Sequence, residues 1–340
     1  MANGNVATPM IEVRNIPQVA TLMVAPVLNP QPPTLSKSFL HSGDLGDAIY
    51  AMPAMRDAGG GCLFLTNRDG LKTMDQRRFD TIAPLFKSQD YISDVRWWNG
   101  EKIDHDFTNF RPTRNHRLTL AEVQSRYIGT DPKGYERQWL TLAPINHDRI
   151  LIHRSPRYRT DGFPWLGVLE HFGKRLLYCG LKNEHQMFVN DFGDVDFYEP
   201  KDLLEYGRMI CGSELFIGNQ SAPYSVAEGL KHKVVLEAFL PAPDCMFVRD
   251  GAIQVTGDSF FFDGKVIENP VKFFFAENGS LPIKVNSQVF VKWTRRQIGG
   301  SWNGILKTSN SAEIIAARRQ FASGVKVISE TEFEEILKHK

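Results

Sequence analysis

Two short turns hold the residues whose types and spacing could do chemistry. The first, Gly43-Asp44-Leu45-Gly46-Asp47, lies between an apolar run and a segment with helical spacing. Glycines let a backbone approach a ligand closely, and the N-terminus of a helix favours anions. The same residues are also typical of a tight strand-to-helix turn in which Asp44 or Asp47 only caps the helix. The turn matches neither the P-loop pattern nor Gly-x-Gly-x-x-Gly.

The second turn, Gly218-Asn219-Gln220-Ser221-Ala222-Pro223, also follows an apolar run and opens a helical segment. Its small residues would expose backbone N–H groups to a diphosphate, and Asn219, Gln220 and Ser221 could add side-chain hydrogen bonds. The alternative is an N-capped helix start, with Ser221 as the cap and Pro223 as an early helical residue.

Further polar candidates follow other apolar runs. The loop His153-Arg154-Ser155-Pro156-Arg157-Tyr158-Arg159 places three arginines where a strand ends. Arginines there suit phosphate oxygens, although a solvated basic loop is the alternative. Glu184 and His185 follow Gly180 and could contact a ribose or a base, or be ordinary polar loop residues.

The segments that would position the first turn read as strand, turn, helix and strand. We expect strands at 38–41 and 62–66, and between them a helix at 48–58 that Pro53 kinks. This pattern predicts a βαβ unit. The polar and aromatic segment 103–111 is expected to border a cleft.

A second alternation of strands and helices begins near residue 149 and predicts a parallel sheet covered on both faces. The expected strands are 150–153, 175–179, 195–198, 214–217 and 233–236, and the expected helices are 165–172, 200–211 and 222–230. We therefore predict two Rossmann-like domains, 35–145 and 146–257, facing one another. Ligands of such sheets bind beyond the carboxyl ends of the strands, where both turns lie.

The two ends of the chain differ from this pattern. Residues 1–34 carry several prolines and predict an extended arm. Residues 258–340 form an extension of unknown role, with strand-like runs at 271–275 and 287–293 and a helix-like run at 312–321.

Composition narrows the class of protein. The 340 residues are 42% hydrophobic and 23% charged, with a net charge of +1, values typical of a two-domain globular protein without a strong basic bias. No Cys-x-x-Cys pair occurs among Cys62, Cys179, Cys211 and Cys245, which argues against a zinc knuckle and favours a reducing compartment. Without a signal-like start or an apolar run that could span a bilayer, the expected location is cytoplasmic.

Taken together, the motifs resemble the ADP-heptose:lipopolysaccharide heptosyltransferase family, glycosyltransferase family 9. The Gly46-Asp47 pair, followed by an apolar helix start and Pro53, is similar to that family's N-terminal Gly-Asp and Pro-Ala-Leu. The run 215–223 resembles its Phe-Ile-Gly-Asn-Asp-Ser-Gly-Pro, and the stretches 157–165 and 180–184 resemble its basic loop and its Gly-Gly-Pro-x-Glu turn. The similarity runs over roughly residues 38–240 in order. It implies a divergent member with a GT-B fold.

The resemblance also implies a mechanism: inverting transfer of a sugar from a nucleotide-diphosphate sugar. Asp47 would be the general base for an acceptor hydroxyl. The departing diphosphate would be stabilised by Arg157, Arg159 and the N–H groups near Ser221 and Ala222, without a required metal or other cofactor. Glu228 is a weaker candidate for the donor ribose, or else a solvent-facing helix residue.

Three departures leave the substrate and the activity open. Gln220, Ala222 and Ser225 stand where the family has Asp, Gly and His, and that Asp and His help to hold the donor. The expected acceptor is a bacterial surface glycan or a lipid-linked sugar. The first alternative is a phage-type enzyme that glycosylates modified DNA bases, with a C-terminal basic patch of Lys292, Arg295, Arg296, Arg318 and Arg319. The second is a non-catalytic nucleotide- or sugar-binding protein.

Overall fold

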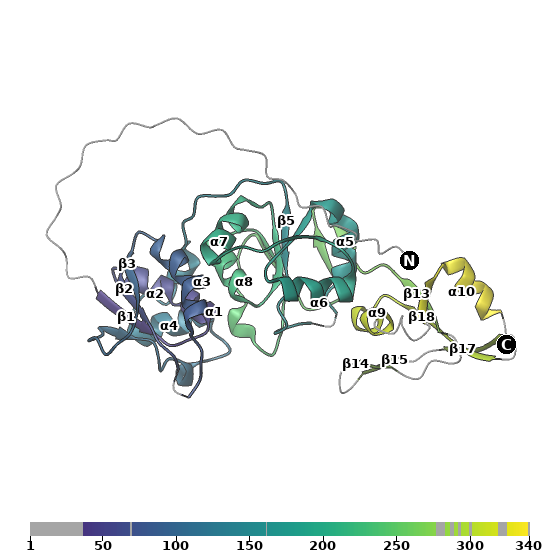
Figure 1. The fold of residues 1–340 in the computed structure, drawn as a ribbon, viewed down its shortest axis with the longest axis horizontal. Coiled ribbons are helices and arrows are strands. Elements are labelled where there is room, and N and C mark those ends of the chain that lie inside the picture. The colour runs from purple at the N-terminus through teal and green to yellow at the C-terminus, as the bar shows by residue number, and fades with distance from the viewer. Residues whose placement is uncertain are drawn as a thin grey trace, which may run out of the picture. The chain divides into compact units, whose positions relative to one another are not determined.

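The computed structural model describes residues 37–68, 70–160, 162–276, 283–285, 289–291, 294–298, 301–318 and 325–338 (Figure 1). The proline-rich arm expected at 1–34 lies outside the described residues. The two sheets that were predicted and the C-terminal extension belong to one unit, Ser36–Lys340.

The N-terminal sheet has four parallel strands in the order β3-β2-β1-β4. The strand order reverses beside β1, because the chain moves from β1 to β2 and β3 and then returns to the other side of β1. Such a reversal leaves a crevice at the carboxyl ends of the strands. The strands are β1 (Lys37–His41), β2 (Gly61–Leu65), β3 (Ile92–Trp97) and β4 (His105–Asp106), and the helices are α1 (Leu45–Tyr50), α2 (Met52–Asp57), α3 (Gln76–Lys87) and α4 (Leu120–Ile128).

The helix expected at 48–58 is in fact two short helices, α1 and α2, separated at Ala51. The expectation of one kinked helix was wrong. Pro53 lies in the first turn of α2, where backbone N–H groups make no intrahelical hydrogen bond, so proline starts a new helix there instead of kinking a longer one. Helix α1 also begins earlier than expected, so Asp47 lies inside its first turn.

The C-terminal sheet has six parallel strands in the order β10-β9-β8-β5-β6-β7. Counted within this half, the order is the doubly wound 3-2-1-4-5-6, with the reversal between β5 and β8. The α/β class with two parallel Rossmann-like sheets, predicted from the sequence, is confirmed. The strands are β5 (Ile150–His153), β6 (Leu176–Cys179), β7 (Asp196–Tyr198), β8 (Phe216–Asn219), β9 (Val234–Glu237) and β10 (Ala252–Val255), and the helices are α5 (Trp165–Phe172), α6 (Lys182–Phe192), α7 (Leu203–Gly212) and α8 (Ala222–Gly229).

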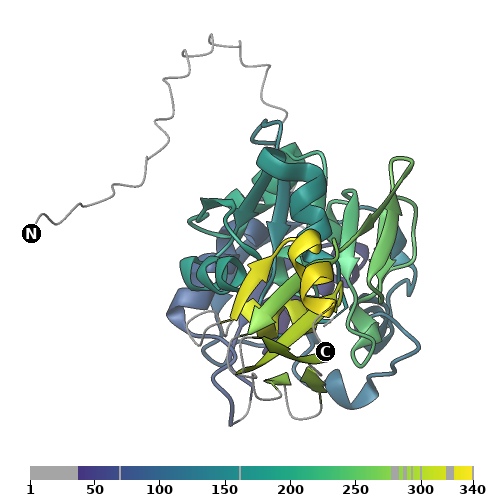
Figure 2. The same ribbon diagram turned by 90° about the vertical axis from the view of Figure 1, so that its right-hand side faces the viewer.

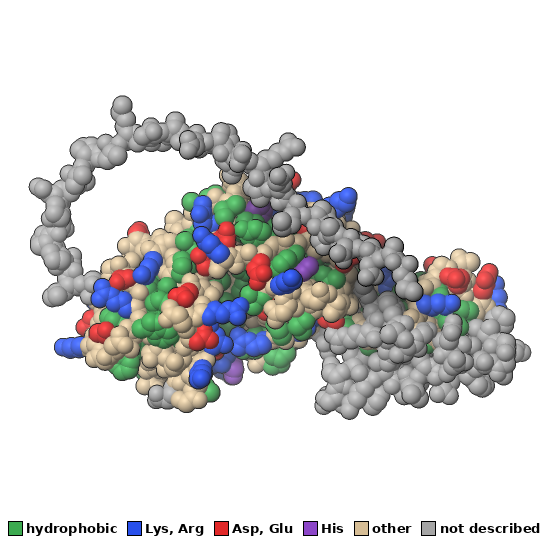
Figure 3. All heavy atoms as spheres, in the orientation of Figure 1, with side chains coloured by type: hydrophobic (Ala, Val, Ile, Leu, Met, Phe, Trp, Pro, Cys, Tyr) green, Lys and Arg blue, Asp and Glu red, His purple; other side chains and the backbone are tan. Residues whose placement is uncertain are grey.

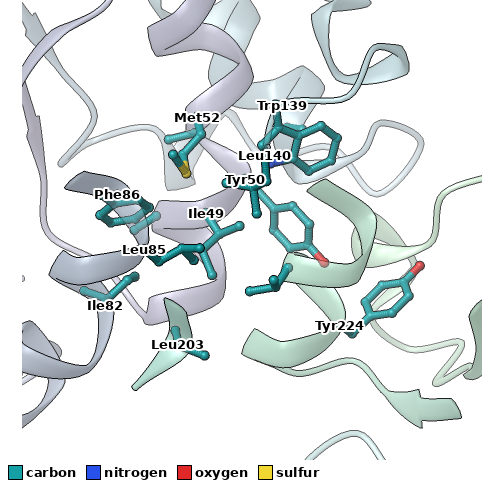
Figure 4. Close-up of a cluster of buried hydrophobic side chains, with 14 of the residues drawn as sticks. Ile49, Tyr50, Met52, Ile82, Leu85, Phe86, Trp139, Leu140, Leu203 and Tyr224 are labelled. Carbon is teal, nitrogen blue, oxygen red and sulfur yellow. The ribbon is translucent and has the colours of Figure 1, made fainter. Parts of the chain in front are cut away.

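One hydrophobic core joins helices that belong to the two sheets. Ile49 of α1 and Leu85 of α3 are fully buried in the same cluster as Tyr224 of α8 (Figure 4). Val226 of α8 belongs to this cluster too. Helix α1 packs on α8, and α3 packs on α7. Because each buried aliphatic side chain contributes about 1.5–3 kcal/mol, this cluster holds the carboxyl ends of the two sheets beside one another.

The C-terminal extension packs on the second sheet's domain. Its hairpin of β11 (Ser259–Phe262) and β12 (Lys265–Glu268) lies against α5, where a Cβ on Gly167 would be 2.1 Å from the Glu268 carbonyl oxygen. A four-stranded antiparallel sheet follows in the order β16-β17-β13-β18. Figure 2 shows the C-terminal part of the chain, coloured light green to yellow, from the side of this sheet. The other elements are β13 (Lys272–Ala276), β14 (Ile283–Val285), β15 (Val289–Val291), β16 (Thr294–Ile298), β17 (Ser301–Thr308), β18 (Val325–Ile328), α9 (Ser311–Arg318) and α10 (Glu330–Leu337).

The expected strand-like and helix-like runs of the extension are therefore largely present. Strand β13 matches the run at 271–275, and helix α9 matches the run at 312–321. Residues 319–321 of the second run lie outside the described part. Only 289–291 of the run 287–293 is described, as β15.

Substitution of Leu85 by alanine tests the shared core. Leu85 is fully buried, and its Cδ1 lies 3.7 Å from the Cβ position of Gly207 in α7. We expect Leu85→Ala to lower the free energy of unfolding by about 2–5 kcal/mol, measured by urea denaturation. Leu71→Ala, at a side chain that is 53% exposed, is the control and should change it by no more than about 0.5 kcal/mol. Equal effects of the two substitutions would contradict the role assigned to the core.

Candidate active site

A cavity of about 790 Å³ lies where the two groups of helices meet. Its volume is within the range of pockets that hold small molecules and cofactors. One wall comes from α1 and α3, through Leu45, Arg77, Asp80 and Thr81. The other wall comes from the carboxyl ends of β5, β6 and β8 and the segments after them, and includes His153, Ser155, Pro156, Arg157, Gly180, Leu181, Glu184, Ser221, Ala222 and Pro223. The residues from Glu199 to Leu203 and Tyr206 complete it.

The two glycine-containing turns meet beside this cavity. A Cβ on Gly46 would be 3.8 Å from Ser225 Oγ and 4.0 Å from the Cα of Ala222, which are ordinary van der Waals distances. Leu45 from the first turn and Ala222 from the second line the same cavity. Gly218 and Asn219 are the last residues of β8, so the second turn is shorter than its sequence suggests.

Asp47 is held by an arginine from a distant part of the chain. Arg111 Nη2 donates to Asp47 Oδ2 at 2.5 Å, and the Arg111 guanidinium lies 4.6 Å from the centre of the Phe110 ring. Burial raises the pKa of Asp47 above its usual range, and the charge of Arg111 opposes this shift. Gly43 makes the contact sterically feasible, because a Cβ there would be 2.1 Å from Arg111 Nη2.

A buried histidine and a glutamine fix the backbone of the first turn. His41 Nδ1 accepts a hydrogen bond from the Gly43 N–H at 2.9 Å, so the ring proton is on Nε2 and is donated to Gln124 Oε1 at 3.0 Å. Gln124 Nε2 in turn donates to the Asp47 carbonyl at 2.9 Å. Burial and the nearby Arg111 lower the pKa of His41 to about 3, so the ring is neutral near pH 7.

These partners of Asp47 are residues that the sequence did not assign to the site. Arg111 begins a 3-10 helix, Arg111–Thr113, just after β4 and at the end of the segment 103–111 that was expected to border a cleft. Gln124 lies on α4, where its spacing gives no sign of a functional role. Asp44 is half-exposed, with Arg68 Nη2 3.6 Å from its Oδ2.

Asn219 and Gln220 support loops and do not line the cavity. The Asn219 side chain accepts from the Ser155 N–H at 3.0 Å and donates to the carbonyls of Ser155 and Arg157, at 3.1 and 2.5 Å. Gln220 donates to the Ala242 carbonyl at 2.5 Å and accepts from the Phe239 N–H at 2.7 Å. Their amide groups thus hold the loops that follow β5 and β9.

The three arginines of the basic loop have different surroundings. Arg154 is buried against the Glu237 carboxylate, which also accepts from the Thr160 N–H at 2.7 Å and from Trp165 Nε1 at 3.0 Å. Arg159 donates to the Ser155 carbonyl at 2.9 Å and is not among the cavity-lining residues. Arg157 is exposed and lines the cavity.

The remaining candidates divide in the same way. Gly180 and Glu184 line the cavity, and burial raises the pKa of Glu184. Glu228 is fully buried and forms ion pairs with Arg249 and Lys231. It is therefore neither a solvent-facing helix residue nor free to contact a ribose. Ser221 Oγ donates to the Asn219 carbonyl at 3.1 Å.

Neither a cluster of metal-binding side chains nor a membrane-spanning helix occurs in the part of the chain that the structure describes. No three His, Cys, Asp or Glu side chains there are grouped so as to hold a metal ion. Two Asp-x-Asp runs, 104–106 and 194–196, lie outside the cavity lining. Within the same ranges, no helix is both long and apolar enough to cross a membrane.

No protein-family profile and no curated protein sequence matches the chain. Its fold is similar to solved structures at low sequence identity. The dodecameric iron-containing heptosyltransferase TibC in complex with ADP-D-β-D-heptose is 16% identical, with a TM-score of 0.45 and coverage of 64% of this chain and 62% of that chain. The matched part is thus less than two thirds of that chain. A glycosyl transferase family 9 protein from Veillonella parvula is 13% identical (TM-score 0.43, 65% and 85%), and E. coli heptosyltransferase WaaC with ADP is 11% identical (TM-score 0.43, 64% and 92%).

Removal of the Asn219 amide tests its supporting role. Asn219→Ala leaves buried backbone groups of the loop after β5 without partners, and we expect the free energy of unfolding to fall by about 1–3 kcal/mol. Asn219→Asp should lower it at least as much, because a carboxylate cannot donate to the carbonyls of Ser155 and Arg157. Asn183→Ala, at an exposed position of α6, is the matched control. Urea denaturation measures the free energy of unfolding of all three variants. If Asn219→Ala leaves this free energy unchanged, the supporting role of Asn219 is disproved.

Proposed function

We propose that the chain is a glycosyltransferase that moves a sugar from a nucleotide-diphosphate sugar to an acceptor hydroxyl. One observation carries the proposal: the turn of Asp47 and the helix start at Ala222 come from different parallel sheets and meet beside one cavity. A donor bound at one wall would thus lie within reach of an acceptor bound at the other. The motif resemblance of residues 38–240 to glycosyltransferase family 9 supports the same reaction.

The donor's diphosphate would bind between β5 and β8. The first turn of α8 has backbone N–H groups without helical partners, and these favour an anion. Arg157 lines the same region, and no ion pair to its guanidinium is found among the described residues. As the bond to the sugar breaks, charge develops on the diphosphate, and these N–H donors would stabilise it. This arrangement requires no metal ion.

Asp47 would take the proton of the acceptor hydroxyl. Its Oδ2 is held by Arg111, and no partner for Oδ1 lies in the described part of the chain. The raised pKa makes this carboxylate a stronger base than an exposed aspartate. The acceptor oxygen would bond to the anomeric carbon opposite the departing diphosphate, so a single displacement inverts the configuration. A bacterial surface glycan or a lipid-linked sugar is the proposed acceptor.

The surface charges on one face of the described part of the chain do not favour DNA as the acceptor. On the face shown in Figure 3, lysine and arginine side chains lie among acidic ones. Two residues of the expected C-terminal basic patch, Lys292 and Arg319, lie outside the described residues. The side chains of the other three, Arg295, Arg296 and Arg318, are not described. The non-catalytic alternative is decided by the experiments below.

Replacement of Asp47 by asparagine tests the general base. We expect Asp47→Asn to lower kcat by about 10²–10⁴-fold with donor affinity unchanged. In the wild type, kcat should fall as pH falls through the pKa of Asp47, and at a higher pH than for an ordinary aspartate because that pKa is raised. Asp131→Asn, an exposed carboxylate paired with Arg137, is the control. Steady-state turnover with an added acceptor measures these effects, and full activity of Asp47→Asn would exclude the assignment.

Replacement of Arg157 by alanine tests the diphosphate site. Loss of one charge-assisted hydrogen bond should weaken binding of a nucleoside diphosphate about 10–100-fold. The ligand is first chosen by thermal shift from ADP, GDP, UDP, CDP and dTDP, because a ligand that binds the folded state stabilises it. Calorimetry then gives the Kd, with Arg126→Ala on α4 as the control. Undiminished affinity would remove Arg157 from the site. If no nucleoside diphosphate binds, the proposed function is overturned.

A further inference from the structure

One ring nitrogen of His153 has a hydrogen-bond partner among the described residues, and the other does not. His153 is the last residue of β5, is 4% exposed and lines the cavity. Its Nδ1 lies 3.1 Å from the Cys179 carbonyl oxygen. A carbonyl oxygen only accepts, so Nδ1 carries the ring proton and Nε2 carries a lone pair. No hydrogen-bond partner for Nε2 is found in the described ranges.

The ring is held in one orientation by its neighbours. The rings of Tyr178 and Tyr206 lie 6.1 and 6.0 Å from it, between centres. Gly180 leaves room for the imidazole, because a Cβ there would be 2.8 Å from His153 Nδ1. Tyr206 also donates its hydroxyl proton to the Cys179 carbonyl that holds Nδ1. These contacts make the imidazole a fixed acceptor in the cavity wall.

The charge of the ring decides what kind of group it can bind. Burial lowers the pKa of His153 to about 4, so the imidazole is neutral at physiological pH. A neutral nitrogen with a lone pair repels a phosphate oxygen and attracts an O–H or N–H group. The ring therefore cannot serve the diphosphate.

The position of the ring favours the nucleoside part of the donor. The diphosphate site proposed above lies between β5 and β8, whereas the His153 ring contacts Gly180 at the end of β6, on the other side of β5. Glu184, four residues after Gly180, lines the same wall and also presents an acceptor. Two acceptors on one wall suit a ribose, whose 2′- and 3′-hydroxyls are adjacent donors.

We propose that His153 is a specificity-determining residue whose Nε2 accepts a hydrogen bond from a ribose hydroxyl of the nucleotide-sugar. The inference rests on the proposed function, since it assumes a nucleoside diphosphate in the cavity.

The test compares a nucleoside diphosphate with its 2′-deoxy and 3′-deoxy forms. The wild type should bind the deoxy form that lacks the hydroxyl bonded to His153 Nε2 about five- to tenfold more weakly than the ribose form, as expected for one lost hydrogen bond. His153→Phe keeps a ring but has no acceptor. This variant should bind the ribose form and that deoxy form with the same Kd. His185→Phe is the matched control, because His185 is held by the Val195 carbonyl at 3.0 Å and does not line the cavity. It should keep the wild-type ratio.

A measurement on the unaltered protein covers the case in which His153→Phe does not fold. In the ¹⁵N NMR spectrum of labelled wild type, the His153 Nε2 signal should shift on addition of the ribose form and not on addition of the discriminated deoxy form. The role of His153 is overturned if the wild type binds the ribose form and the deoxy forms with equal Kd, or if His153→Phe weakens binding of the ribose form and of the discriminated deoxy form by the same factor. Either result leaves the glycosyltransferase proposal standing. If no nucleoside diphosphate binds, both are overturned.

Discussion

The packing of α1 against α8 is the constraint on which the rest of the site depends. The two helices start at the carboxyl ends of different sheets, and small residues let their first turns approach, with Gly46 near Ala222 and Ser225. Burial of Ile49, Tyr224 and their neighbours in one cluster stabilises this approach. Without it, Asp47 and the α8 N–H groups would belong to separate surfaces, and neither wall alone would form the cavity.

The loops that border the cavity are held by buried polar groups. Asn219, Gln220 and Glu237 are nearly or fully buried, and each bonds to the backbone of a loop that follows a strand. An unpaired polar group at these depths would be destabilising by about 1–3 kcal/mol, so each loop conformation is strongly favoured. The loops beside the cavity are therefore held in fixed positions, which is the preorganisation that stabilisation of a developing charge would require.

The electrostatic surroundings of the first turn differ from those of the cavity wall formed by the second sheet. Beside the first turn, burial keeps His41 neutral and raises the pKa of Asp47, while Arg111 holds one oxygen of that carboxylate. Across the cavity, Arg157 and the helix start offer donors to an anion, and Glu184 and His153 offer acceptors. The proposed proton acceptor and the proposed anion site thus lie on different elements beside one cavity, as the proposed transfer from a charged donor to a neutral hydroxyl would require.

The sequence by itself determined the alternation of strands and helices, because short apolar runs such as Ile150-Leu151-Ile152, alternating with helical segments, are typical of strands buried on both faces of a parallel sheet. It also placed both turns at strand ends. Only the tertiary structure decided which polar residues line the cavity and which support it. Asn219 and Glu228 have the chemistry of ligands, but Asn219 bonds to backbone and Glu228 pairs with a partly buried arginine. Gln124 gave no local signal, and Arg111 and His153 were only members of polar segments with no role of their own. The physical reason is that the role of a polar side chain depends on which distant groups the fold brings within hydrogen-bond distance, and spacing along the chain does not contain that information.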